Sequence, residues 1–206
     1  MNKSITLICF VIMLAICGSA FSQQMSLTGF GGYTFQDKVY AYNGDVTIRD
    51  GAHYGAMLSV RPNTTTSLEL TYFRQDTEFA VTDYSSIVVD NYNIAGSMNY
   101  IMLGASHSPD FTAPIAPYGG FMIGAAVVAP QEDYSDVWQF AVGGKLGAIF
   151  NANEKIGILI QTQLMVPVQG VGFAVGCSGS GCGSGLSTSS SATQFGFTGG
   201  IEFKIQ

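Results

Sequence analysis

Apolar and polar residues alternate along most of this chain with a period of two, which constrains its fold more than any other feature. The C-terminal segment shows it most clearly, because Phe195, Phe197, Ile201, Phe203 and Ile205 alternate with polar residues or glycine. Successive residues of a β-strand point to opposite faces of a sheet. The pattern therefore predicts an all-β chain whose strands each have an apolar and a polar face.

Eight segments carry this alternation, and turn-rich or polar stretches separate them. In chain order they are Met25–Phe35, His53–Arg61, Leu68–Gln75, Tyr92–Leu103, Ile115–Val128, Val137–Phe150, Ile156–Val168 and Gln194–Gln206. Long or polar connections such as Gln36–Ala52 and Gly176–Ala192 alternate with shorter ones, and Ser106–Pro114 is a long exception. An even number of antiparallel strands can close with both chain ends on one side, as in outer-membrane barrels. We therefore expect an eight-stranded antiparallel up-and-down barrel.

The first residues have the three parts of a secretory signal peptide: the basic Lys3, the apolar run Ile5–Cys17, and the small residues that follow it. An N-terminal membrane anchor is disfavoured because this run is shorter than the roughly 17–25 residues of a helical span. Lipid attachment at Cys17 is disfavoured because Ile16 stands where a small residue is expected. Cleavage fits after Ala20 or Ser22, so we expect residues 1–22 to form the signal peptide and residues 23–206 one barrel domain.

The composition suits a barrel that faces lipid. Charged residues make up only 11% of the chain and the mean hydropathy is +0.29, yet no later apolar run is long enough for a membrane helix. In a transmembrane barrel every second residue faces lipid, which accounts for the low charge. A net charge of −6 argues against nucleic acid as a partner, because that binding depends on Lys and Arg.

The polar faces of the strands predict a charged network inside the barrel. Its members are Arg61, Glu69, Lys145, Glu202 and Lys204, and both signs of charge are present, so pairing can offset desolvation. The turn after Arg61 is expected to place that residue opposite Glu69 as a cross-strand ion pair. A packed polar core is favoured over a gate or a proton path. The uncharged members of the inward set are Ser97, Asn99, Gln139, Gln161 and Gln163.

Aromatic residues of the apolar faces are expected to form two girdles at the membrane boundaries. The outer girdle would contain Tyr33, Phe35, Trp138, Phe140, Phe195 and Phe197, and the periplasmic one Tyr100, Phe150 and Phe203. Met98 and Met102 are placed on the same outward face as Tyr100. Alternation also places Arg74 on this face, where it either meets lipid headgroups or is turned by a bulge.

Two cysteines remain after the signal peptide, Cys177 and Cys182, and they lie five residues apart in a Gly/Ser-rich loop. After export they would meet an oxidising environment, so a small loop-closing disulfide is favoured over two free thiols. The sequence has no calcium-loop pattern among its acidic residues and no phosphate-binding glycine loop. We therefore expect no metal and no cofactor.

The signal peptide, the eight segments and the stretches Ala116–Phe121 and Phe197–Phe203 together resemble the OmpA/OmpX-like outer-membrane β-barrel family over the whole mature chain. The resemblance implies a location in the outer membrane. It also implies outer-membrane lipid, lipopolysaccharide and the outer-membrane assembly machinery as partners.

Three functions remain open on the sequence. The leading one is a non-enzymatic outer-membrane protein that acts in the envelope or at the surface through its loops, without a wide pore. The second is a lipid A-modifying enzyme that would use His53 with Asp50 and a loop serine, although no nucleophile, base and orienting group are grouped by spacing. The third is a soluble lipocalin-like carrier, which would have apolar residues inside and polar residues outside.

Overall fold

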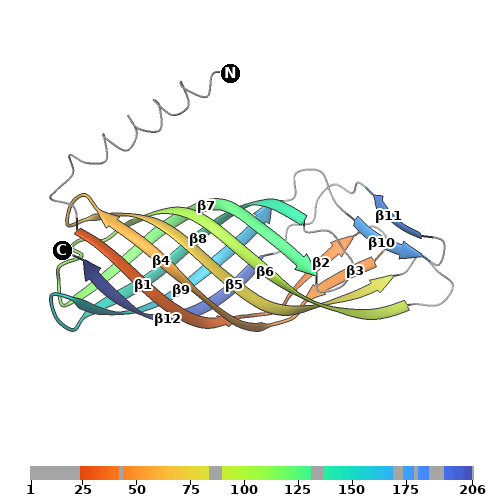
Figure 1. Ribbon diagram of the computed structural model, residues 1–206, viewed down its shortest axis with the longest axis horizontal. Helices are drawn as coiled ribbons and strands as arrows, with labels where there is room; N and C mark the ends of the chain where they lie inside the picture. The colour runs from red at the N-terminus through yellow and green to blue at the C-terminus, as the bar shows by residue number, and fades with distance from the viewer. Residues whose placement is uncertain are drawn as a thin grey trace, which may run out of the picture.

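The computed structural model describes residues 24–41, 44–83, 90–130, 137–168, 174–178, 181–185 and 193–205 (Figure 1). Its strands are β1 (Gln24–Thr34), β2 (Asp37–Ala41), β3 (Gly44–Ile48), β4 (Gly51–Arg61), β5 (Thr66–Asp83), β6 (Asp90–His107), β7 (Ile115–Pro130), β8 (Val137–Asn151), β9 (Ile156–Val168), β10 (Ala174–Ser178), β11 (Gly181–Gly185) and β12 (Gln194–Ile205). Among the described residues, no helix is long and apolar enough to span a membrane.

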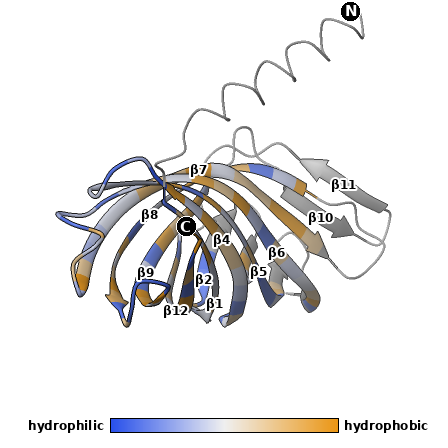
Figure 2. Cartoon of the chain, turned by 60° about the vertical axis from the view of Figure 1, so that its left-hand side comes forward, coloured by the Kyte–Doolittle hydropathy of each residue, from blue (hydrophilic) through white to orange (hydrophobic). Residues whose placement is uncertain are grey.

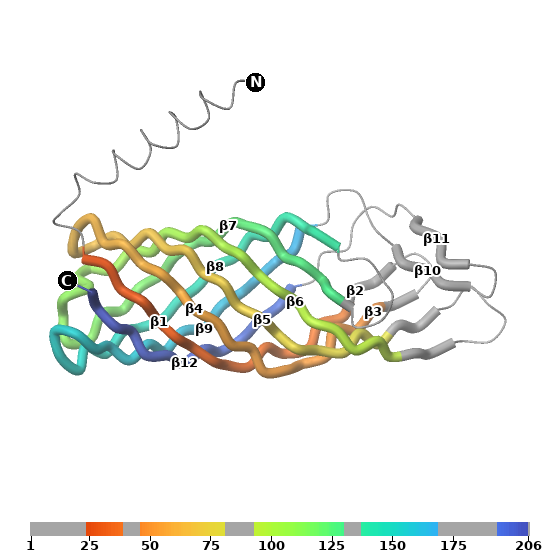
Figure 3. The backbone as a smooth tube through the Cα atoms, viewed as in Figure 1, coloured from red at the N-terminus to blue at the C-terminus, as the bar shows by residue number. Residues whose placement is uncertain are grey.

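Eight of these strands close into an antiparallel barrel. The order around it is β1, β4, β5, β6, β7, β8, β9 and β12, and β12 pairs with β1 to complete the circle. Closure leaves no unpaired edge among these strands, which is what a hydrocarbon environment requires. Figure 3 shows the strands running obliquely to the long axis of the barrel. Each predicted segment corresponds to one barrel strand, so the predicted fold is confirmed.

Two barrel strands are longer than predicted. β5 and β6 pair continuously from Thr66 opposite His107 to Asp83 opposite Asp90. The apolar pattern of the sequence ends earlier, because Asp76 and Glu78 place charges on the face of β5 whose earlier residues are apolar. β2 and β3 form a hairpin within the predicted loop Gln36–Ala52, and β3 pairs with the extension of β5. β10 and β11 form a separate two-stranded sheet.

The three connections at one end of the barrel share one type of hydrogen-bonded turn. The side-chain oxygen of Asn63 accepts hydrogen bonds from the backbone N–H groups of Thr65 and Thr66, and Asn153 does the same two and three residues ahead. Asp110 accepts from Thr112 in the connection between β6 and β7. The hydroxyl and the backbone N–H of Thr112 lower the pKa of Asp110. These Asx turns stand at one end of the barrel, called the turn end here, where β1 begins and β12 finishes (Figure 1).

The outer face of the barrel is apolar and the lumen is largely polar. The side chains of Phe197, Ile160 and Phe140 are 52%, 56% and 55% exposed, whereas Gln161 and Lys145 are 5% and 3% exposed. Figure 2 shows apolar and polar residues alternating along the strands. This is the predicted arrangement, and it is the reverse of what a lipocalin-like carrier would have.

One strand departs from the predicted faces. Met98, Tyr100 and Met102 of β6 were expected on the outer face, but all three are buried in the lumen. Asn99, expected inside, lies on the outer face and accepts a hydrogen bond from the exposed hydroxyl of Tyr72. Tyr100 is therefore not part of an aromatic girdle. The reason is that this level of the lumen is packed by aromatic and methionine side chains, so apolar character alone does not identify the lipid-facing side.

Candidate functional site

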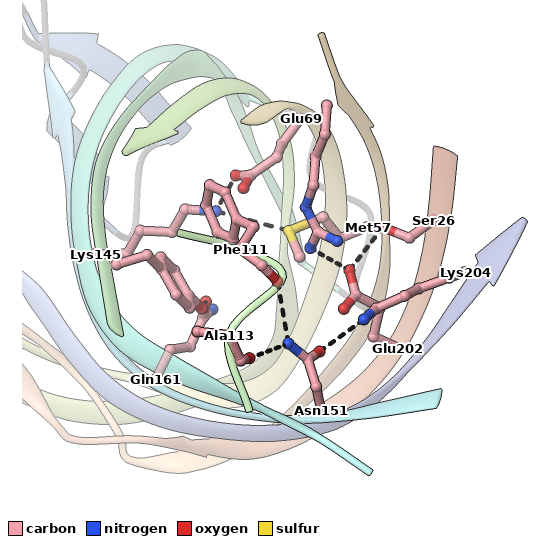
Figure 4. Close-up of polar contacts among 12 residues, drawn as sticks. Ser26, Met57, Glu69, Phe111, Ala113, Lys145, Asn151, Gln161, Glu202 and Lys204 are labelled. Carbon is pink, nitrogen blue, oxygen red and sulfur yellow. Dashed lines mark hydrogen bonds and ion pairs between the residues drawn. The ribbon is translucent and has the colours of Figure 1, made fainter. Parts of the chain in front are cut away.

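Two buried ion pairs occupy the lumen near the turn end and form the candidate site. Arg61 of β4 pairs with Glu202 of β12, and Lys145 of β8 pairs with Glu69 of β5. None of these four side chains is more than 4% exposed. Figure 4 shows the carboxylates of Glu69 and Glu202 with their partners inside the barrel wall. A charge in such a place is tolerated only when it is paired and hydrogen-bonded.

The pairing differs from the predicted one. The register of β4 and β5 places Ser59, and not Arg61, opposite Glu69. The predicted ion pair between Arg61 and Glu69 is therefore wrong. The physical reason is the Asx turn at Asn63, which starts β5 two residues earlier than the apolar pattern does.

Glu202 has one further hydrogen-bond partner. Ser26 of β1 donates its hydroxyl to the same carboxylate oxygen as Arg61, at 2.7 Å. Lys204, the fifth residue of the predicted network, is half-buried and donates to the side-chain oxygen of Asn151 at 2.7 Å. The structure thus places Lys204 beside the ion pairs, at the edge of the cluster, with its ammonium group turned towards the end of β8 (Figure 4).

Lys145 stands among groups that suit a buried cation. Its ammonium group lies 3.6 Å from the sulfur of Met57 and 5.8 Å from the ring centroid of Tyr118. The Tyr118 hydroxyl donates to Gln161 at 2.7 Å, and Gln161 donates to Gln163 at 3.2 Å. The polar side of the lumen therefore continues from Lys145 along β9 as a chain of hydrogen bonds.

The connection between β6 and β7 covers the turn end of the lumen. The backbone N–H of Phe111 donates to the carbonyl of Thr64 at 2.7 Å, which ties the connection to the β4–β5 turn. The side-chain amide of Asn151 donates to the carbonyls of Phe111 and Ala113 from the opposite side. The buried Phe111 ring lies 4.7 Å from the Arg61 guanidinium. This is why the connection is longer than the other two turns.

Sequence reasoning missed Phe111 and Asn151 as parts of the site. The one indication in the sequence is the unusual length of Ser106–Pro114, with the aromatic Phe111 near its middle. Asn151 offered no comparable indication, because an asparagine after a strand most often belongs to a turn.

The other half of the lumen is packed by rings. His53 is buried and its two ring nitrogens lie 2.9 and 2.8 Å from the hydroxyls of Thr34 and Thr198. Phe73 and Tyr100 stack with ring centroids 4.5 Å apart, and the Tyr100 hydroxyl donates to Gln194 at 2.5 Å. Asp50, the proposed acidic partner of His53, instead accepts a hydrogen bond from Tyr33 on the outer face. The grouping of His53 with Asp50 that the lipid A-modifying alternative would use is therefore not formed.

Charged residues follow the apolar band on the outer face. Arg74 faces outward and pairs with Asp76 at 2.8 Å, while Arg49 pairs with Glu78 at 3.6 Å. No bulge turns Arg74 inward, because β5 pairs with both of its neighbours without interruption at this point. A shallow depression of about 500 Å³ is lined by Arg49, Asp50, Asp76, Thr77, Glu78, Ala95 and Gly96. These charges stand beyond Tyr54 and Tyr72, where an aqueous boundary is expected.

Two further predictions concern cysteines and metals. The backbones of Cys177 and Cys182 lie opposite each other in the β10–β11 hairpin, but their side chains lie outside the described residues, so the disulfide stays a prediction. In the described part of the chain, no group of three or more His, Cys, Asp and Glu side chains is placed to hold a metal ion.

Comparison with known proteins identifies the fold. The sequence matches no protein-family model and no curated protein. The similar solved structures include Neisserial surface protein A (TM-score 0.59, 11% identity, 88% of this chain and 97% of that chain), the outer membrane protein OprG from Pseudomonas aeruginosa (0.57, 12%, 89% and 96%), and the N-terminal β-barrel domain of OprF from the same organism (0.53, 12%, 88% and 97%). The chain has the fold of these small outer-membrane barrels.

Proposed function

We propose that this chain is a non-enzymatic protein of the bacterial outer membrane, which reaches it by a cleaved signal peptide and acts in the envelope or at the surface through its loops. The proposal is supported above all by the polarity of the barrel. Large apolar side chains cover the outside while paired charges fill the inside. Only a lipid environment makes that arrangement favourable, because an exposed apolar belt of this extent would aggregate in water.

The absence of a wide pore is the second part of the proposal. Eight strands enclose a lumen that side chains can fill. Here the ring packing around Phe73 and Tyr100, the two ion pairs and the cover formed by Phe111 follow one another along the axis. A solute larger than water would have to displace at least one of these layers. The barrel then acts as an anchor for the loops at its other end.

A catalytic role receives less support. Lipid A modification by a histidine would require a base, an orienting acid and a nucleophile within hydrogen-bond reach of one another. The neighbours of His53 are two threonine hydroxyls and the rings of Phe30 and Phe73, inside the barrel and away from the lipid face. This arrangement suits a histidine that fills the lumen.

The loops are the proposed surface for contact with other molecules. Lipopolysaccharide and outer-membrane lipid are the proposed neighbours of the apolar band and of the charged rim around Arg74. The outer-membrane assembly machinery is the proposed partner during insertion. β9 finishes at Val168 and β12 begins at Gln194, at the end of the barrel opposite the turn end, so the connection between them, which includes residues 176–192, would face the cell exterior.

Fractionation and proteolysis test this proposal together. The chain, expressed with its own N-terminus in a two-membrane bacterium, is expected in the outer-membrane fraction, with faster gel mobility before boiling than after it. Protease added to intact cells is expected to cut within residues 176–192 and to leave the barrel whole. Recovery as a detergent-free soluble monomer would contradict the proposal. A stable conductance of a wide channel in planar bilayers would contradict its second part.

A further inference from the structure

Several buried polar atoms around Arg61 lack hydrogen-bond partners. They include Nε and Nη1 of Arg61 and the hydroxyl groups of Ser67, Ser106 and Ser108, and the Ser59 hydroxyl and Oε2 of Glu202 are likewise without a partner. All six residues are almost fully buried. Folded proteins pair more than nine in ten of such groups, and leaving one unpaired costs about 1–3 kcal/mol. A cluster of unpaired donors therefore indicates a bound species.

These donors are neighbours in the barrel wall. The register of β4 and β5 pairs Val60 with Leu68, which places Ser67 beside Arg61. Ser67 also lies directly opposite Ser106 of β6. Ser108 lies two residues after Ser106, and its backbone N–H donates to the carbonyl of Thr65 at 2.9 Å. Arg61, Ser67, Ser106 and Ser108 come from β4, β5, β6 and the cover, and the Phe111 ring of the cover lies 4.7 Å from the Arg61 guanidinium.

Gly120 makes room for this group. It lies opposite Ser106, and a Cβ atom on Gly120 would approach the Ser106 hydroxyl oxygen to 2.4 Å. It also lies opposite Lys145 on its other side. Gly120 stands in the row of residues that runs from Arg61 through Ser67 and Ser106 towards Lys145. Because it has no side chain, it leaves room for the Ser106 hydroxyl.

The charge of the surrounding lumen favours an anion. Arg61 and Lys145 balance Glu202 and Glu69, and Lys204 adds one positive charge in excess at the edge of the cluster, where it donates to Asn151. Glu69 is paired with Lys145, and the free oxygen of Glu202 is directed towards Gly157 of β9. Neither carboxylate therefore satisfies Nε and Nη1 of Arg61.

We propose that these donors bind one small inorganic anion of chloride size, held by Nε and Nη1 of Arg61 and by the hydroxyls of Ser67, Ser106 and Ser108. The anion neutralises the excess charge and gives each donor a charge-assisted hydrogen bond, which is stronger than a bond to water. Because Ser108 belongs to the cover, the bound anion also fastens the cover to the barrel wall. This site is independent of the proposed surface role.

Anomalous diffraction from crystals grown in bromide tests the site directly. The expected result is one anomalous peak inside the barrel, in contact with the Arg61 guanidinium and at least two of the serine hydroxyls. The double variant Ser67→Ala/Ser106→Ala is expected to lose the peak. Thr71→Ala is the matched control, because the Thr71 hydroxyl is likewise buried and without a partner but lies four residues from Ser67 along β5. The control is expected to keep the peak.

A solution measurement gives an independent readout. Urea unfolding in detergent micelles is compared in sodium chloride and in sodium gluconate at equal ionic strength, since gluconate is too large for the site. With chloride at ten times its dissociation constant, the unfolding equilibrium constant is expected to fall about elevenfold. The serine double variant should lose this difference. Density in the bromide crystals that refines as water without an anomalous peak, a peak unchanged in the double variant, or equal stability of the wild type in the two salts would overturn the proposal.

Discussion

The outer face and the lumen of this barrel follow different rules. On the outer face, large apolar side chains such as Phe121 and Leu146 are exposed without specific partners. In the lumen, Glu202, Glu69 and their neighbours each depend on a particular partner on another strand. Contact with lipid therefore determines which side chains suit the outer face, whereas specific pairing determines which side chains suit the lumen. The outer face should therefore tolerate any apolar replacement and the lumen almost none.

The largest effect is expected in the lumen. Arg61→Met should lower the free energy of unfolding by about 3–5 kcal/mol, because Glu202 then becomes a buried charge without its main partner. Reversible urea unfolding in phospholipid vesicles, followed by the fluorescence of the single tryptophan Trp138, measures this change.

The double variant Arg61→Met/Glu202→Met is its control. Removing both charges should restore much of the lost stability, because an apolar pair of similar volume replaces a buried ion pair at little cost. If the double variant is as unstable as the sum of the two single variants, the side chains do not act as a pair.

A charge on the outer face comes next. Ile160→Lys should lower the free energy of unfolding in vesicles by about 2–4 kcal/mol, because the residue lies midway along β9 where the acyl chains are expected. Ile160→Leu should change little. Equal stability of the lysine and leucine variants would show that this face does not meet hydrocarbon.

Two glycines of β1 give a sharper version of the same contrast. A Cβ atom on Gly32 would lie 2.0 Å from the carbonyl oxygen of Phe197 and 2.6 Å from His53, whereas one on Gly29 has no heavy atom within 4 Å. Gly32→Ala should therefore cost about 1–3 kcal/mol through overpacking. Gly29→Ala should be neutral or stabilising by up to about 1 kcal/mol. Thermal unfolding in micelles compares the two, and a larger loss for Gly29→Ala would contradict the assignment of faces.

The same contrast explains what the sequence could predict. The alternation of polarity with a period of two predicts the eight strands and the outward direction of residues such as Phe197 and Ile160. It suffices because contact with lipid requires only that a side chain be apolar. The polar residues Gln161 and Lys145 were assigned to the lumen on the same grounds.

The details of the lumen could not be predicted in this way. Both faces of β6 contain apolar residues, with Met98 and Tyr100 on one and Ile101 and Leu103 on the other. Polarity therefore does not indicate which face of β6 points to lipid. The partners of Arg61 and Glu69 depend on strand order around the barrel and on the register set by the Asn63 turn. The cover formed by Phe111 depends on contacts with residues far along the chain. These are three-dimensional relations that a pattern in one strand does not contain.

The smallest effect is expected at the boundary of the two environments. Arg74→Leu should change the free energy of unfolding in vesicles by less than about 1 kcal/mol, because Arg74 and Asp76 are partly exposed and such pairs contribute little. The same unfolding assay measures it. Stabilisation by about 2–4 kcal/mol would instead mean that Arg74 lies within the hydrocarbon.

Quenching of tryptophan by brominated lipids tests the central claim, that the apolar outer face contacts acyl chains. The wild type has Trp138 near one end of β8, and the variant Ile160→Trp/Trp138→Phe carries its only tryptophan midway along β9. In vesicles, bromine near the centre of the bilayer should quench the tryptophan at position 160 most strongly, and bromine near the headgroups should quench Trp138 most strongly. Quenching of both by aqueous iodide, with no effect of brominated acyl chains, would contradict the account.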